Sequence, residues 1–407
     1  MVINGRWVKN KFLHVLYLAG REISGIRNAG RKKDGRKKIL LFCQSQTMEE
    51  HLLNFAKQLK GRPEYALFLC FGEDYPDGKR HKKADTLFRD TRIPVIGDTW
   101  RLYFMRWALV VCPDMDYPFW MKRGTIPALY IGHGSGGISY DGGETSYDYS
   151  SASLDEKGRP LFDVMLEPNK ETARLMKADP VYGLVIRSAG YRFAYKFRDA
   201  SSKKAECQRR LGIPEGKKVV SVWGSWNKES LFHVLGPELF EVCRELKKKG
   251  YEFIFSIHGR EYQKYDDQIE PLGELVEKQR ENGFFVRSPG EDWLPYMLSS
   301  DMIVVDYSSM LSLAVLAGKK VILSDFPDGR IWRKSMYYEI KQVFPVISDA
   351  GGLEQALEDL ERTDRYDSEI ARFREQLYVS EADYKKFIQD VVGELTSDQT
   401  DRRKNRR

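Results

Sequence analysis

The residue with the clearest catalytic potential in this chain is His133, which follows a short apolar run and stands among glycines. The segment reads Ala128-Leu129-Tyr130-Ile131-Gly132-His133-Gly134-Ser135-Gly136. Glycine adopts backbone angles that other residues resist, so the chain can turn sharply here and leave the imidazole in a crevice. Because the pKa of free histidine lies near neutrality, this side chain can remove a proton from a hydroxyl group. A structural histidine in a glycine turn fits the same pattern, so the motif alone leaves both interpretations open.

Two further segments place polar side chains where an apolar run ends. His258 and Arg260 follow the run Phe253–Ile257, and Asp306-Tyr307-Ser308-Ser309 follows Met302–Val305. The two serines open a predicted helix, and free backbone N–H groups with serine hydroxyls at a helix start can bind phosphate. This pattern predicts a phosphate site formed by Ser308, Ser309, Arg260 and Asp306.

Each of these residues also has a structural alternative. Ser308 or Ser309 can cap the helix without binding any ligand. Asp306 can orient a donor hydroxyl or cap the turn, and Arg260 can form a surface ion pair with Glu261 or Asp266. The pair Asp114 and Asp116 resembles a metal-binding DxD motif, but it lies away from the predicted phosphate site. We therefore expect no metal and no cofactor.

Two series of apolar runs alternating with helical patterns must position these residues. The first series of strands is predicted at Ile39–Cys43, Tyr65–Phe71, Trp107–Cys112, Ala128–Ile131 and Asp163–Leu166, with helices at 47–59 and 167–177. The second is predicted at Val219–Trp223, Phe253–Ile257, Phe284–Val286, Met302–Val305 and Val321–Leu323, with helices at 229–248, 268–281, 309–316 and 353–361. Between them lies a charged stretch, 198–218, which reads as irregular. This alternation predicts an α/β protein with two Rossmann-like domains facing each other across a cleft. Because such sheets bind ligands at the carboxyl ends of their strands, His133, His258 and Ser308 would face that cleft.

The domain boundaries expected from this pattern are 38–200 for an N-terminal domain and 201–365 for a C-terminal domain. Helices within 366–395 would return to brace the first domain, and 396–407 forms a basic tail. Residues 1–37 form a separate segment with apolar residues on one helical face, and residues 1–38 carry a net charge of +9. An amphipathic basic helix on an anionic membrane surface fits this segment, as does a surface helix packed on its own domain.

The charge and cysteine content restrict the class of protein. The chain has a net charge of +7, but removing residues 1–38 and the +4 of residues 401–407 leaves the middle at −6, so a general nucleic-acid binder is not expected. The five cysteines are widely spaced, with no CxxC pair, which is typical of buried thiols in a reducing compartment. No secretory signal or membrane-spanning run is recognisable, so a cytoplasmic protein at the inner face of the membrane is expected.

Residues 107–327 resemble the CDP-glycerol glycerophosphotransferases of teichoic-acid and capsule synthesis, which are GT-B enzymes. The resembling segments are Leu109 to Ser135, with Ser135 where the family has threonine; Phe162–Leu166; Gly190-Tyr191-Arg192; His258; and Asp306-Tyr307-Ser308-Ser309 followed by Lys320–Leu323. The resemblance implies that His133 is the catalytic base and that His258, Ser308 and Ser309 bind the donor pyrophosphate. Gly132, Gly134, Ser135 and Gly136 would shape the loop around the base.

The resemblance implies transfer of a polyol phosphate from a CDP-linked donor to a hydroxyl of a lipid-linked or polymeric glycan, with release of CMP. Such a reaction belongs to the synthesis of cell-wall, capsule or spore-coat polymers. Two other functions stay open. The same fold can transfer a sugar from a nucleotide-sugar donor, or it can bind a glycan or membrane without catalysis.

Overall fold

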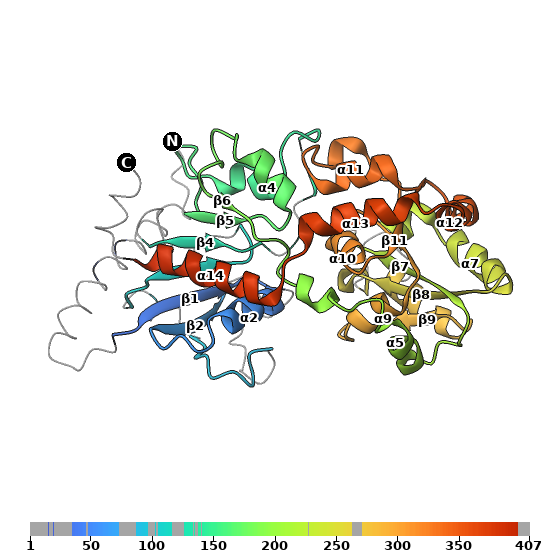
Figure 1. The fold of residues 1–407 in the computed structure, drawn as a ribbon, viewed down its shortest axis with the longest axis horizontal. Helices are drawn as coiled ribbons and strands as arrows, with labels where there is room; N and C mark the ends of the chain where they lie inside the picture. Colours follow the sequence, from blue (N-terminus) through green and yellow to red (C-terminus); the bar gives the residue numbers. More distant parts are fainter. Residues whose placement is uncertain are drawn as a thin grey trace.

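The computed structural model describes residues 35–45, 48–72, 87–96, 105–115, 126–132, 137–139, 141–226, 228–262 and 271–397, together with residues 15, 19, 102 and 134. These residues form two α/β units that lie side by side (Figure 1). No helix in the described part of the chain is both long and apolar enough to cross a membrane. The predicted amphipathic helix within 1–37 falls almost wholly outside the described residues.

The first unit is built on a parallel sheet of strand order β2-β1-β3-β4-β5-β6. Its strands are β1 (Lys37–Cys43), β2 (Tyr65–Phe71), β3 (Leu109–Cys112), β4 (Ala128–Tyr130), β5 (Val164–Leu166) and β6 (Ile186–Arg187). Five of them coincide with predicted apolar runs to within two residues, and Ile39–Leu41 and Leu109–Cys112 are completely buried. Strands covered on both faces read as continuous apolar runs, which explains why they could be recognised.

The second unit has a parallel sheet of order β12-β11-β10-β7-β8-β9. Its strands are β7 (Lys218–Gly224), β8 (Tyr251–Ile257), β9 (Phe285–Arg287), β10 (Met302–Val305), β11 (Lys320–Ser324) and β12 (Val346–Ile347). β7 lies in the middle of this sheet. The next two strands, β8 and β9, extend the sheet on one side of β7, and β10 then pairs with β7 on its other side. Neighbouring strands whose connections run in opposite directions leave a crevice at their carboxyl ends, so the fold places a ligand site between β7 and β10.

Helices cover both sheets (Figure 1). Those associated with the first are α2 (Glu49–Gln58), α4 (Lys170–Met176) and α14 (Glu381–Thr396). Those associated with the second are α5 (Lys204–Leu211), α6 (Leu231–Leu235), α7 (Glu238–Lys248), α8 (Leu272–Glu277), α9 (Leu294–Ser299), α10 (Ser309–Leu316), α11 (Met336–Val343), α12 (Leu353–Arg362) and α13 (Arg365–Leu377). α13 contacts α10 and β11 of the second unit, and α14 contacts α2 and β3 of the first. The chain thus crosses between the units once more near its end.

Three expectations for the second unit were wrong or incomplete. The single helix predicted over 229–248 is two helices, because Gly236 has a positive φ of 66° and Pro237 cannot continue the hydrogen-bond ladder. The stretch 198–218, predicted as irregular, contains α5, which has no buried residue and therefore no apolar stripe to reveal it. α8 covers part of the helix predicted at 268–281, and residues 263–270 lie outside the described part.

The segment Arg330 to Tyr337 of the second unit docks on the first. Ile331 forms an antiparallel bridge with Ile138, and the Trp332 backbone N–H donates to the carbonyl of Gly137 at 2.9 Å. The Trp332 ring is 2% exposed and belongs to the apolar core on the first sheet. These contacts connect the chain immediately after the His133 loop to the second unit.

All five cysteines are free, and four of them are buried: Cys43, Cys70, Cys112 and Cys243. Burial raises the pKa of the Cys70 thiol to about 12, because a thiolate is costly in an apolar surrounding. The structure therefore assigns the buried thiols to packing.

Candidate active site

The carboxyl ends of β7 and β10 are joined through the carboxylate of Asp306. Its Oδ2 accepts hydrogen bonds from the backbone N–H of Ser225 at 2.6 Å, from the Ser225 hydroxyl at 2.7 Å and from the backbone N–H of Leu231 at 3.3 Å. Asp306 is 1% exposed, and its burial raises the pKa of the carboxyl group, opposed by the hydrogen bonds from Ser225 and Leu231. Asp306 thus fixes the loop after β7 against the end of β10, which matches the alternative in which it holds a turn.

Hydroxyl groups near Asp306 lack ordinary partners among the described residues. The buried Ser230 Oγ has none, and the Ser308 hydroxyl faces only the Asp306 carboxylate, whose pKa it lowers. Ser308 is the residue before α10, yet its side chain makes no capping hydrogen bond. Buried polar atoms are almost always paired in native proteins, so unpaired ones at a switch point indicate groups that await a polar ligand. Sequence reasoning missed Ser230; its only signal is its place directly before the apolar start of α6.

His258 stands at the carboxyl end of β8, beside this loop. Its backbone N–H donates to the carbonyl of Gly224 at 3.1 Å, and its Nδ1 accepts from the backbone N–H of Arg260 at 3.1 Å. Burial lowers the pKa of the imidazole, and the charge of Arg260 lowers it further, with Glu261 opposing. The imidazole is therefore neutral at pH 7, with the Nδ1 lone pair occupied and Nε2 left as the N–H donor.

Arg260 lies over the ring of Trp226, 4.3 Å from the ring centroid. Glu261, one of its two predicted ion-pair partners, instead faces His233, with an Nε2–Oε2 distance of 3.1 Å; Asp266 lies outside the described residues. Trp226 is 38% exposed, and its ring centroid is 6.4 Å from that of His258. Together these side chains give the ends of β7 and β8 an exposed cationic and aromatic surface.

His133, Ser135 and Gly136 lie outside the described residues, but the residue before His133 is placed. Gly132 has a positive φ of 68°, and its carbonyl accepts a 2.5 Å hydrogen bond from Nη1 of the buried Arg192. Nη2 of Arg192 donates to the carbonyl of Ile131. Arg192 thus clamps the strand end that leads into His133, a role that the predicted site residues did not include.

On the other side of the loop, Gly137 packs against the ring of Tyr337. A Cβ atom at Gly137 would lie 2.1 Å from Tyr337 Cδ2, so only glycine allows this approach. The Tyr337 hydroxyl donates to the carbonyl of Ser308 at 2.8 Å. One side chain therefore connects the loop that carries His133 to the serine turn. A Cβ atom at Gly134, in the same loop, would have no atom of the described residues within 4 Å.

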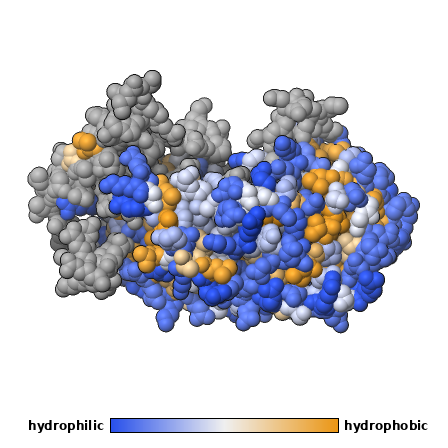
Figure 2. Space-filling view, turned by 90° about the horizontal axis from the view of Figure 1, so that it is seen from above, coloured by the Kyte–Doolittle hydropathy of each residue, from blue (hydrophilic) through white to orange (hydrophobic). Residues whose placement is uncertain are grey.

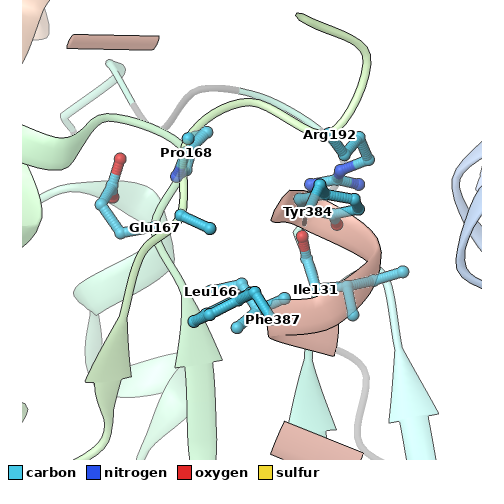
Figure 3. A pocket seen from close by; sticks show the side chains of 9 residues that line it. Ile131, Leu166, Glu167, Pro168, Arg192, Tyr384 and Phe387 are labelled. Carbon is cyan, nitrogen blue, oxygen red and sulfur yellow. Dashed lines mark hydrogen bonds between the residues drawn. The ribbon is translucent and has the colours of Figure 1, made fainter. Parts of the chain in front are cut away.

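A small pocket lies beside this strand end (Figure 3). It is lined by Ile131, Leu166, Glu167, Pro168, Ala189, Gly190, Arg192, Tyr384 and Phe387. The carboxylate of Glu167 accepts from the Tyr149 hydroxyl at 2.7 Å and from the backbone N–H of Asn169 at 2.9 Å. Burial raises the pKa of Glu167 to about 8, and the charge of Asp148 adds to the effect.

The raised pKa of Glu167 predicts a pH-dependent stability. Between the unfolded value of 4.5 and the folded value of about 8, the folded chain holds a proton that the unfolded chain has lost. The free energy of unfolding should thus fall with rising pH in this window, by at most about 1.4 kcal/mol per pH unit. Glu167→Gln, which mimics the protonated form, should remove this slope in denaturant titrations at pH 5–8. Glu171→Gln, at a solvated ion pair with Arg174, is the control and should leave the slope in place; equal slopes in wild type and Glu167→Gln would contradict the assignment.

The described residues contain no group of three or more His, Cys, Asp or Glu side chains that could hold a metal ion. Asp114 Oδ1 accepts from the backbone N–H of Met115 at 2.7 Å, and Asp116 lies outside the described part. The site described above thus consists of hydroxyls, imidazole, guanidinium and backbone groups.

Comparison with known proteins bears on this site directly. The family model described as CDP-Glycerol:Poly(glycerophosphate) glycerophosphotransferase matches residues 190–386. The matched range runs from the strand-end clamp at Arg192 to α14 and includes Ser225, His258, Asp306 and Ser308.

Solved structures with a similar fold cover nearly the whole chain. The wall teichoic acid polymerase TagF is 14% identical, with a TM-score of 0.62 over 97% of this chain and 98% of that one. A TagF variant soaked with CDPG gives 15% identity and 0.61 over 97% and 98%. Anabaena Alr3699/HepE in complex with UDP-glucose gives 13% and 0.52 over 88% and 99%.

These likenesses confirm the predicted fold of two Rossmann-like units, shared with TagF and with GT-B glycosyltransferases. The family match confirms the resemblance that the motifs indicated. The chain is a two-domain α/β transferase whose residues 190–386 match the model of the CDP-glycerol:poly(glycerophosphate) glycerophosphotransferase family.

Proposed function

We propose that this protein transfers glycerol phosphate from CDP-glycerol to a hydroxyl group of a lipid-linked or polymeric glycan in teichoic-acid synthesis. The observation that carries the proposal is the family match, because residues 190–386 include the whole serine and histidine site at the ends of β7, β8 and β10. In this reaction the acceptor oxygen attacks the β-phosphorus, the bond to the bridging oxygen breaks, and CMP leaves with that oxygen.

The residues divide between the two reacting partners. His133 takes the proton of the attacking hydroxyl, and the described neighbours support this role: Arg192 fixes Gly132, and Gly137 lies one side chain away from Ser308. The donor phosphates lie against Ser308, Ser309 and the start of α10. His258 donates through Nε2, and Arg260 neutralises phosphate charge from the surface that it shares with Trp226.

Asp306 acts as a positioning residue in this proposal. Its carboxylate already binds three donors from Ser225 and Leu231, and a carboxylate facing phosphate would repel it. We assign the acceptor to residues 38–200 and the donor to residues 201–365.

Identification of the leaving group tests the proposal. The purified protein, incubated with CDP-glycerol and a glycan acceptor, should release CMP. A parallel panel of nucleotide sugars addresses the alternative glycosyl transfer, in which the nucleoside diphosphate leaves. Release of UDP or CDP without CMP would contradict the glycerophosphate transfer.

We also assign the basic segment 1–38 to the inner face of the cell membrane, since each basic residue near an anionic surface contributes about 1 kcal/mol. Deleting these residues should weaken sedimentation with phosphatidylglycerol vesicles, and the difference should shrink as salt is raised. Unchanged sedimentation at low salt would contradict this assignment.

A further inference from the structure

The turn between α4 and β6 presents apolar side chains to solvent. Leu184 is 89% exposed and Val181 is 38% exposed; Leu175, in the last turn of α4, is also 38% exposed. These three are half of the large apolar side chains that are exposed among the described residues; the others are Val15, Leu87 and Trp226. The face seen in Figure 2 is mostly hydrophilic, with separate apolar patches.

The buried side chain of Tyr182 anchors the turn to the first unit. This side chain is 4% exposed, its ring centroid is 5.2 Å from that of Tyr149, and its hydroxyl lies 2.7 Å from Ser153 Oγ. Asp179 Oδ1 accepts the backbone N–H groups of Val181 and Tyr182, both at 2.9 Å. Because the buried anchor separates the two exposed residues, Val181 and Leu184 are displayed by a fixed backbone and need little further ordering to bind a surface.

The tip of the turn is further closed by Arg187 and Gly183. Nη1 of Arg187 donates to the carbonyl of Leu184 at 2.9 Å. A Cβ atom at Gly183 would lie 2.4 Å from the carbonyl oxygen of Lys177, so the chain doubles back tightly here.

The charges near these apolar residues are mainly basic. Residues 170–187 carry four basic and two acidic side chains; Lys170, at the far end of α4, donates to the carbonyls of Glu375 and Tyr378, which leaves Arg174, Lys177 and Arg187 near the turn. Of the two acidic ones, Glu171 pairs with Arg174 and Asp179 binds the backbone of the turn. Exposed apolar groups beside cations such as Lys177 and Arg187 suit an anionic lipid surface, where the apolar groups enter the headgroup region and the cations meet phosphates.

The position of the turn in the fold favours the same partner. It leads directly into β6, and the sheet is parallel, so it lies at the same edge as the start of β1 at Lys37. The basic segment that precedes β1 in the sequence therefore enters at this edge. α14 begins at the pocket beside the carboxyl ends and runs toward this edge, where it ends at Thr396 before the basic tail (Figure 1).

We propose that the turn 177–185 is a membrane contact, in which Val181 and Leu184 enter the headgroup region of an anionic bilayer. This contact places the amino edge of the first sheet on the membrane and leaves the carboxyl edge, with the transfer site, facing the second unit. The proposal uses no step of the transfer reaction and stands apart from it.

Tryptophan placed at the tip of the turn reports insertion directly. In the full chain, the L184W variant should show more tryptophan fluorescence than wild type. Phosphatidylglycerol vesicles with brominated acyl chains should quench this additional fluorescence. L87W is the matched control: Leu87 is 56% exposed, and its N–H binds Glu49 at the start of α2, by the carboxyl edge. Quenching in L184W alone supports the contact, and the same quenching of both variants or of neither overturns it.

A second measurement uses removal of the apolar groups. The V181S/L184S variant should bind phosphatidylglycerol vesicles at least about tenfold more weakly than wild type, with L87S unchanged. CMP release from CDP-glycerol should be equal in all three, so that failure of the transfer proposal is seen separately. Equal vesicle binding by V181S/L184S and wild type would overturn the contact. The contact would also be overturned if wild type were a dimer in the absence of vesicles and V181S/L184S were a monomer, because the turn would then bind a second copy of the chain.

Discussion

Replacing His133 by alanine should lower the rate of CMP release from CDP-glycerol by a factor of about 10²–10⁴. The expected loss is in kcat, because His133 removes the proton of the attacking hydroxyl and the donor is held by the other unit. The dissociation constant of CDP-glycerol, measured by calorimetry, should stay within about twofold of wild type.

Two observations distinguish a catalytic base from a structural histidine here. Circular dichroism and the unfolding midpoint of His133→Ala should match wild type, because Arg192 and Tyr337 hold the chain on both sides of the loop through Gly132 and Gly137. His81→Ala, at a histidine in no motif, controls for the type of substitution. Full turnover in His133→Ala would leave the fold and family intact but remove the proposed base.

The strands and the site motifs could be predicted because a strand that is buried on both faces consists of consecutive apolar residues, and polar residues mark where it ends. β10 is a continuous apolar run, β1 becomes one after its two lysines, and β7 is interrupted after Lys218 only by Ser221. The polar residues that follow β8 and β10 lie at or beside the switch point, together with Ser225 after β7. Short edge strands such as β6 and β12 leave no such signal, because two residues cannot show a period.

Contacts between the units could not be predicted, because they join residues that lie far apart in the chain. Nothing near Trp332 in the sequence indicates that its ring packs on the first sheet. The same holds for Arg192, whose buried guanidinium binds carbonyls 60 residues earlier. Sequence patterns report what an element buries, but not which partner covers it.

The last helices of the chain illustrate a related limit. The sequence predicts helices within 366–395 that return to the first unit, and α14 does contact α2 and β3 there. α13 contacts α10 and β11 of the second unit as well as α4 of the first. An apolar stripe predicts burial without specifying the sheet that supplies it.

Gly137→Ala should reduce both stability and turnover, since its methyl group would lie 2.1 Å from Tyr337 Cδ2. The ring cannot easily move aside: Tyr337 is 2% exposed, and its hydroxyl donates to the Ser308 carbonyl. Overpacking of this kind costs about 1–3 kcal/mol. Because the strain falls between the His133 loop and the serine turn, a displacement of about 1 Å should also cost roughly 100-fold in kcat.

Gly134→Ala is the matched control for stability, because it makes the same change in the same loop, and no described residue has an atom within 4 Å of the new Cβ. Its free energy of unfolding in urea should lie within about 0.5 kcal/mol of wild type. The double variant Gly137→Ala/Tyr337→Ala should be more stable than the sum of the two single changes, because the second change removes the obstacle. If Gly137→Ala unfolded at the same urea concentration as Gly134→Ala, Gly137 would not pack closely against Tyr337. The His133 loop would then be connected to the second unit through the hydrogen bond between Trp332 and Gly137 instead.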